Sequence, residues 1–272
     1  MEHDNIPHQN TDSPIGDIAY LARSEHRVPT LVALTERPRS RSELCELAGV
    51  SSSTIRRTLD EFEDRVWICK DGYQYTATRL GEVVVSGMED LIEQVETERK
   101  LRDIWHWLPE EASEFPIETW EAMTITVAEP DSPYRPIDRF ESLLKETNHL
   151  RLVGPEIALI EPCFELLVKL IDEGVDVFLV ARPESHTYFL STYPERSVEM
   201  MQQDNFTVLE HDSLPPCGTG LLDERTTISC YEQDSGTVHL LIDTDVAAVR
   251  EWAESVCETY ASEGHPVEPP YE

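Results

Sequence analysis

The chain has 272 residues, of which 54 are acidic and 22 are basic, and its formal net charge is −32. Its hydrophobic fraction of 40% is enough for packed cores, and its length allows one large domain or two ordinary ones. No stretch approaches the roughly 20 apolar residues of a membrane-spanning helix, and the polar, acidic N-terminus does not resemble a secretory signal. We therefore expect a cytoplasmic protein with no membrane association.

The basic residues are almost all arginine, because lysine occurs only at positions 70, 100, 145 and 169. An acidic chain of this kind stays soluble at high ionic strength, where its self-repulsion is screened. Together with the scarcity of lysine, this is typical of the cytoplasm of a salt-accumulating halophile. An ordinary acidic protein is the alternative that composition leaves open.

The sequence contains none of the common signatures of a catalytic or metal site. Its six cysteines are scattered and form no CxxC pair, which argues against a zinc site and against a disulfide framework. We expect most of them to be small buried residues, with redox sensing by one of them left open. A glycine-rich phosphate loop, a GxSxG elbow and an HExxH motif are all missing. We expect no enzymatic activity, no metal and no cofactor.

Charge is distributed unevenly along the chain. Residues 1–80 carry ten basic and thirteen acidic side chains, whereas residues 81–272 carry twelve and forty-one. Within residues 37–57 the sign reverses, with five arginines against two glutamates. Attraction to phosphate would explain a positive segment in so acidic a chain, and a chance cluster on a solvated face is the alternative.

Two short helices are predicted first, from residue 15 onward, by apolar residues at helical spacing in 18–22 and 28–34. Pro38 ends the second of them. Ser40 followed by Glu43 predicts a capping box at the start of a helix over 41–48, which Gly49 closes in a left-handed turn. The residues that we expect this helix to bury are Leu44, Leu47 and Ala48.

A second helix follows the glycine turn at once. Ser51 is its predicted N-cap, and Ile55, Leu59 and Phe62 form its apolar side. Two short helices joined by a Gly-Val-Ser turn predict a helix-turn-helix, whose second helix enters a DNA groove. A hairpin around Asp71-Gly72 comes next and predicts the wing of a winged helix-turn-helix, with Trp67 and Tyr75 in its core.

The polar side of the second helix suits nucleic acid. Hydroxyls at a helix start favour phosphate, because the free backbone N–H groups there already attract anions. Arg56 and Arg57 can reach bases or phosphates, and Lys70 and Tyr73 lie at the wing tip. The predicted interface with double-stranded DNA comprises Arg39, Arg41, Ser51, Ser52, Ser53, Thr54, Arg56, Arg57, Lys70 and Tyr73. A winged helix that contacts only protein, in a non-enzymatic interaction adaptor, is the alternative.

Residues 80–109 are predicted to form a linking helix, continuous or broken in two, that Pro109 ends. Its apolar residues step by three and four, at Leu80, Val84, Met88, Leu91 and Val95. Such a stripe pairs subunits in many dimers, although it could equally pack on the second domain of the same chain. We expect a homodimer and four segments: a tail (1–14), the winged helix-turn-helix (15–79), the linking helix (80–109) and an α/β domain (110–272).

The rest of the chain alternates between strand-like and helix-like runs. The apolar runs LRLVG and VDVFLVA, separated by a helix, predict a buried parallel βαβ unit, and the later strands are expected to be antiparallel. The predicted fold class is therefore α+β, with a C-terminal α/β sandwich around a mixed sheet. The strands are expected at 123–127, 150–153, 175–180, 206–209, 220–222, 226–231 and 238–242, and the helices at 137–147, 157–173, 196–203 and 245–263.

A ligand pocket is the expected use of this domain, because ligands bind beyond the carboxyl ends of parallel strands. One such end is followed by Arg182, a rare positive charge that could hold an anionic metabolite, with a salt bridge to a nearby acid as the alternative. His186 and Tyr188 follow on what we expect to be the same loop. A second irregular segment, 215–220, could line the pocket or simply connect strands.

The chain resembles a large family of haloarchaeal winged helix-turn-helix regulators in IAYLARSEHRVPTLVALTERPRSRSELCELAGVSSSTIRRTLDEFEDRVWI, YTATRLGEVV and VETERKLRDIWHWLP. Its later part is similar, in GLLDERTTISCY and VREWAESVCETYASEGHPV, to an effector domain named after a methanogenesis regulatory protein. The resemblance implies DNA binding by the first domain and regulation through the second, in a dimer. A small-molecule effector of unknown identity is expected from the predicted pocket and not from the resemblance, since most members of the family have no assigned ligand. It places residues 51–57 on the recognition helix.

Overall fold

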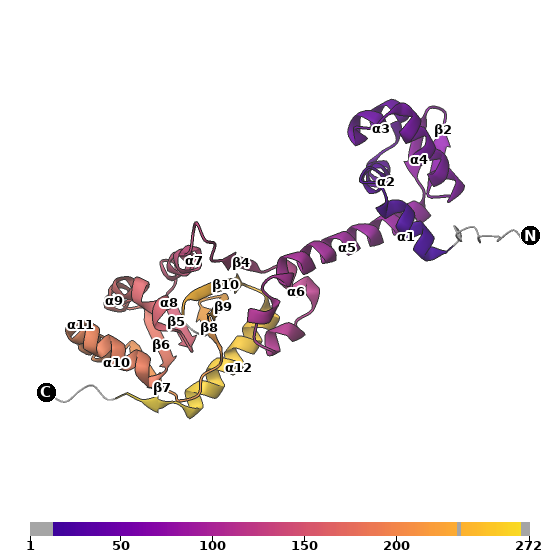
Figure 1. The fold of residues 1–272 in the computed structure, drawn as a ribbon. Coiled ribbons are helices and arrows are strands. Elements are labelled where there is room, and N and C mark those ends of the chain that lie inside the picture. The colour runs from indigo at the N-terminus through magenta and orange to yellow at the C-terminus, as the bar shows by residue number, and fades with distance from the viewer. Residues whose placement is uncertain (1–12, 233–234, 268–272) are drawn as a thin grey trace, which may run out of the picture. The chain divides into compact units, whose positions relative to one another are not determined.

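The computed structural model describes residues 13–232 and 235–267, which divide into two compact units at the boundary between Glu96 and Thr97 (Figure 1). The predicted tail lies outside the described residues except at its end, where Ser13 caps the first helix and Pro14 begins it.

The first unit is a winged helix-turn-helix, as predicted. Its three strands form an antiparallel sheet in the order β1-β3-β2. One buried cluster joins the helices to this sheet, with Leu34, Leu44, Leu59 and Phe62 at its centre. The elements are α1 (Pro14–Ala22), α2 (Arg27–Glu36), β1 (Arg39–Ser40), α3 (Arg41–Ala48), α4 (Ser52–Asp64), β2 (Ile68–Asp71), β3 (Gln74–Ala77) and the start of α5 (Arg79–Arg102).

The turn between α3 and α4 follows the sequence signals closely. Ser40 accepts a hydrogen bond from the Glu43 amide, and the Glu43 carboxylate accepts one from the Ser40 amide, so the capping box is complete. Gly49 takes the left-handed conformation at φ 63°, which costs glycine nothing. The prediction that Leu47 is buried was wrong, since its side chain is 45% exposed; Leu44 is the fully buried residue of α3, and Cys45 and Ala48 pack against the core beside it.

Helix α5 packs so closely against the start of the wing at Gly81 that only glycine fits at this position. A Cβ atom added at Gly81 would lie 2.0 Å from the backbone oxygen of Trp67. Val85 and Met88, one and two turns further along, are buried in the first unit's core. The predicted stripe is therefore divided, because Val84 and Met88 pack within the unit whereas Leu80, Leu91 and Val95 remain exposed.

The second unit is built on an eight-stranded mixed sheet in the order β11-β7-β6-β5-β8-β9-β10-β4. The predicted βαβ unit is present, because β5 and β6 are parallel; β7 extends the parallel part, and the remaining pairs are antiparallel. The strands are β4 (Thr124–Val127), β5 (His149–Val153), β6 (Asp176–Ala181), β7 (Phe206–Glu210), β8 (Cys217–Leu222), β9 (Arg225–Tyr231), β10 (Val238–Thr244) and β11 (His265–Pro266).

Helices cover both faces of this sheet, which makes the unit a layered α/β sandwich of the predicted class (Figure 1). Leu150 and Val177 point to the face where α7 and α9 pack, and Val153 and Val180 point to the opposite face, against α12. The helices are α6 (Ile117–Glu121), α7 (Arg135–Leu144), α8 (Ile157–Ile160), α9 (Phe164–Asp172), α10 (Pro183–Thr192), α11 (Pro194–Met201) and α12 (Ala247–Glu263).

Three expectations for this unit were wrong. The helix predicted over 157–173 is broken around Pro162, which lacks the N–H that a continuous helix needs. The loop expected to carry His186 and Tyr188 is helix α10. The expected irregular segment 215–220 becomes the buried strand β8 from Cys217 onward.

Candidate nucleic-acid interface

Helix α4 has one side in the core and one side exposed. Ile55 and Leu59 are buried, whereas Ser52, Arg56 and Arg57 on the other side are exposed. The two sides follow from helical spacing, since the buried residues recur every three or four positions. We call the exposed side, together with Arg41 at the start of α3, the α4 surface.

The α4 surface gathers three guanidinium groups in a shallow depression lined by Arg41, Ser52, Ser53, Arg56, Arg57 and Asp60. The Arg56 Nε atom lies 3.7 Å from the Asp60 carboxylate, a loose and solvent-exposed pair. Within the described residues, Arg41 and Arg57 form no ion pair. Positive charge therefore remains available on this surface for an anionic partner.

The other two predicted residues of α4 and its cap, Ser51 and Thr54, serve the helix itself. The Ser51 hydroxyl accepts a hydrogen bond from the Thr54 amide at 3.2 Å and lies 2.9 Å from the hydroxyls of Ser53 and Thr54. This hydroxyl network satisfies backbone groups that a helix start leaves unpaired.

Arg39 differs from the arginines of the α4 surface because its guanidinium group is largely buried and paired within the chain. Its side chain is only 14% exposed; Nε donates to the backbone oxygen of Ala33 at 2.8 Å and a terminal nitrogen lies 2.6 Å from the Glu36 carboxylate. Arg37 is likewise paired, at 3.0 Å from the Glu43 carboxylate. Two of the five arginines in the positive segment, Arg37 and Arg39, are thus paired with glutamates of the same chain.

The wing carries two predicted residues at its tip. Tyr73 lies in the turn between β2 and β3 and is 92% exposed. Lys70 is exposed at the end of β2, with its Nζ atom 5.3 Å from the centre of the Tyr75 ring. Neither side chain is needed by the core, so both are accessible.

Several contacts fix α4 within the first unit. The His26 Nε2 atom lies 3.0 Å from the Thr58 hydroxyl, and burial together with the neighbouring Arg27 lowers the pKa of His26. Arg65, just after the helix, pairs with Asp17 at 2.9 Å and with Glu61. These contacts hold the α4 surface in one orientation relative to α1 and α2.

In the second unit the three residues predicted to bind a ligand do not line one common site. The Arg182 Nε atom lies 3.6 Å from the Glu156 carboxylate, which is the salt bridge considered as its alternative role. The Tyr188 hydroxyl donates to the Glu161 carboxylate. Of these three residues, His186 lines a cavity to whose walls Arg182 and Tyr188 do not contribute.

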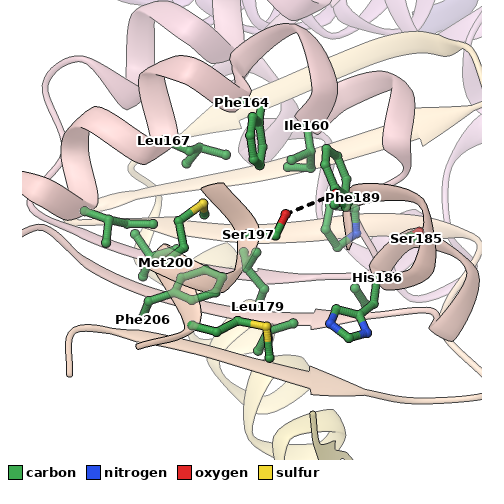
Figure 2. Close-up of a pocket in the computed structure, with 16 residues that line it drawn as sticks. Ile160, Phe164, Leu167, Leu179, Ser185, His186, Phe189, Ser197, Met200 and Phe206 are labelled. Carbon is green, nitrogen blue, oxygen red and sulfur yellow. Dashed lines mark hydrogen bonds between the residues drawn. The ribbon is translucent and has the colours of Figure 1, made fainter. Parts of the chain in front are cut away.

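This cavity of about 70 Å³ lies over β6 and β7, beneath α9, α10 and α11. In Figure 2, Ile160 and Phe164 form one wall and Leu179 lies opposite them, with the His186 imidazole at one end. No sequence pattern indicates this cavity, because each apolar residue in its walls has the pattern of an ordinary core residue.

In the described part of the chain, no group of three or more His, Cys, Asp or Glu side chains could hold a metal ion. No helix described is both long and apolar enough to cross a membrane. Four of the six cysteines are buried, in line with the sequence.

Comparison with protein families decides the identity of the fold. Residues 15–100 match the model described as HVO_A0261 N-terminal domain, and residues 133–263 match that of the methanogenesis regulatory protein FilR1, middle domain. The two segments are thus a domain of each of these two families, and the predicted resemblance is confirmed. The two matches together support a DNA-binding regulator rather than an enzyme.

Solved structures give weaker similarity. The chain is similar to TrmBL2, described as an archaeal chromatin protein, at 12% identity and a TM-score of 0.44, over 94% of this chain and 100% of that one. An IclR homolog from Microbacterium sp. strain HM58-2 gives 14% identity and a TM-score of 0.24, over 87% and 95%. HmgR from Pseudomonas aeruginosa gives 12% and 0.25, over 88% and 94%. No curated protein matches this regulator.

Proposed function

We propose that this regulator controls transcription by inserting α4 into the major groove of double-stranded DNA, and that its second unit adjusts binding in response to a small molecule. One observation carries the proposal: α4 keeps Ile55 and Leu59 in the core while it presents Ser52, Arg56 and Arg57 to solvent. A helix placed in this way can read base edges without disturbing its own fold.

The residues divide by the kind of contact their chemistry suits. Arg56 and Arg57 carry planar guanidinium groups, which bind guanine edges through two hydrogen bonds. Lys70 at the wing is a point charge, which suits a phosphate of the adjacent backbone. Arg39 is a weaker candidate, because its guanidinium is already bound to Ala33 and Glu36.

A homodimer would let two α4 helices read a two-fold symmetric operator. The exposed apolar residues of α5 that support such a pairing are Leu91, Ile92 and Val95. Leu91→Glu would place a charge in that contact, so we expect it to halve the mass measured by sedimentation equilibrium. An unchanged mass would exclude this helix as the contact.

The test is selection of duplexes from a random pool, followed by binding assays with variants. We expect the wild-type chain to select a defined motif, and Arg56→Ala or Arg57→Ala to relax the preference at individual base pairs, each worth about 1–3 kcal/mol. Arg102→Ala is the control, since its side chain is exposed on the second unit and pairs with Glu98 at 2.7 Å. Failure to enrich any duplex would favour the interaction adaptor.

A further inference from the structure

We propose that the cavity beneath α10 and α11 binds a small, mainly apolar molecule that ends in a hydroxyl group, and that Nε2 of His186 accepts a hydrogen bond from that hydroxyl. The inference rests on the proposed function, in which the second unit senses a ligand. It adds the chemical class of that ligand.

The cavity walls are almost wholly hydrocarbon, contributed by side chains such as Phe164, Leu179 and Phe206. Three lining residues are polar, Ser185, His186 and Ser197. The Ser197 hydroxyl already donates to the backbone oxygen of Phe189 at 3.1 Å (Figure 2). A charged or highly polar ligand would lose its hydration here without replacement, so the ligand must be mainly apolar.

His186 is the group that can orient such a ligand. Its Nδ1 atom lies 2.9 Å from a carboxylate oxygen of Glu210, and a carboxylate only accepts, so Nδ1 carries a hydrogen. In the neutral imidazole Nε2 then holds a lone pair. That Nε2 atom is buried and has no hydrogen-bond partner among the described residues. An unpaired buried acceptor is costly, and a ligand hydroxyl would satisfy it.

The cavity volume limits the ligand to a few heavy atoms. At about 70 Å³ it is roughly half of an apolar cavity of about 150 Å³ that takes up benzene. A chain of three to five heavy atoms fits this space, which points to a short-chain aliphatic alcohol. The flexible side chains of Met200 and Met201 in the wall can yield to admit the longer members.

The probe is 1-butanol, and its control is methyl propyl ether, which has the same atoms but no O–H. Binding to the full chain is measured by ligand-observed NMR titration. We expect 1-butanol to bind with a Kd of about 1 mM, as befits so few atoms, and the ether at least about tenfold more weakly. Equal affinity for alcohol and ether would overturn the role of His186.

Two variants test the site. His186→Phe removes the acceptor, and Leu179→Phe fills the cavity while it keeps His186; we expect each to weaken 1-butanol binding by at least about tenfold. His211→Phe is the matched control, since His211 also lies beside a glutamate, Glu263 at 3.4 Å, but does not line the cavity. Full binding by the Leu179→Phe variant would place the alcohol elsewhere and overturn the proposal.

The same protein samples are titrated with the selected duplex, so that the two proposals fail separately. A chain that binds the duplex but gives no 1-butanol signal overturns the alcohol site and leaves the DNA assignment standing. A chain that binds 1-butanol through His186 but binds no duplex supports the alcohol site and overturns the proposed DNA-binding function.

Discussion

Lys70 offers a quantitative test of how the wing meets DNA. Its ammonium group is exposed and lies 5.3 Å from the centre of the Tyr75 ring, so Lys70→Gln removes a charge without removing a core contact. A lysine that neutralises one phosphate adds about 0.9 to the slope of log affinity against log salt concentration. Over a fourfold rise in salt, one such contact changes affinity by about 3.5-fold.

The structure also bounds the slope of the wild-type chain. Arg37 and Arg39 are paired with acids, which leaves Arg41, Arg56, Arg57 and Lys70 as the cations of the proposed interface. Four contacts give a slope of at most about 3.6 per chain, or about 150-fold over a fourfold rise in salt. Few phosphate contacts are what a chain of net charge −32 requires if it binds DNA in concentrated salt.

The assay is fluorescence anisotropy of the selected duplex in a KCl series between about 0.5 and 2 M, with potassium chosen to match a salt-accumulating cytoplasm. We expect Lys70→Gln to lower the slope by about 0.9 with no change in base preference. Lys169→Gln is the control, because that lysine is exposed on α9, 3.6 Å from Glu173. An unchanged slope for Lys70→Gln, or a wild-type slope twice the bound, would refute the reasoning.

Three further predictions concern the first unit and are measured by urea unfolding. Gly81→Ala should lower the free energy of unfolding by about 1–3 kcal/mol, because the added methyl group would meet the Trp67 backbone. Gly87→Ala, in the same helix but with open space around it, should raise the free energy of unfolding by up to about 1 kcal/mol. Equal effects of the two substitutions would refute the packing argument. Val66→Gly should raise the free energy of unfolding by about 1 kcal/mol, since Val66 is 57% exposed and held at φ 58°, which only glycine adopts freely, and a loss would contradict this strain. A hydrogen bond from the Ser40 backbone, joined by side-chain donors, lowers the pKa of Glu43 from 4.5 to about 2. The contribution of Glu43 to the free energy of unfolding is therefore present above pH 4.5 and is lost as the pH falls toward 2. Glu43→Gln should flatten that part of the pH profile of stability, and an unaltered profile would exclude the cap as its source.

Local signals in the sequence predicted the first unit well. The capping box at Ser40 and Glu43 and the left-handed Gly49 depend on residues close in sequence, so their pattern is sufficient. Leu47 was misplaced because helical spacing shows which side of α3 is apolar but not how far the core extends around it. The pairing of Arg39 with Ala33 and Glu36 also depends on how β1 passes α2, which the residue order does not reveal.

Sequence patterns predict the second unit less completely. Parallel strands β5 and β6 were predicted from two largely apolar runs, but α10 was not, because its apolar residues are few and weakly periodic. The unpaired Nε2 of His186 arises from the packing of α10 over β6 and β7, segments whose sequence separation hides the contact. Such a cavity becomes visible only in three dimensions.

The most direct test of the account is photo-crosslinking to the selected duplex from a benzophenone side chain placed at Ser52 on α4 or, as a control, at Ser255, an exposed serine of α12. We predict that DNA is captured from position 52, that the captured nucleotides lie within the selected motif, and that position 255 captures none. Capture from position 255 with none from position 52 would show that α4 is not the surface that meets DNA.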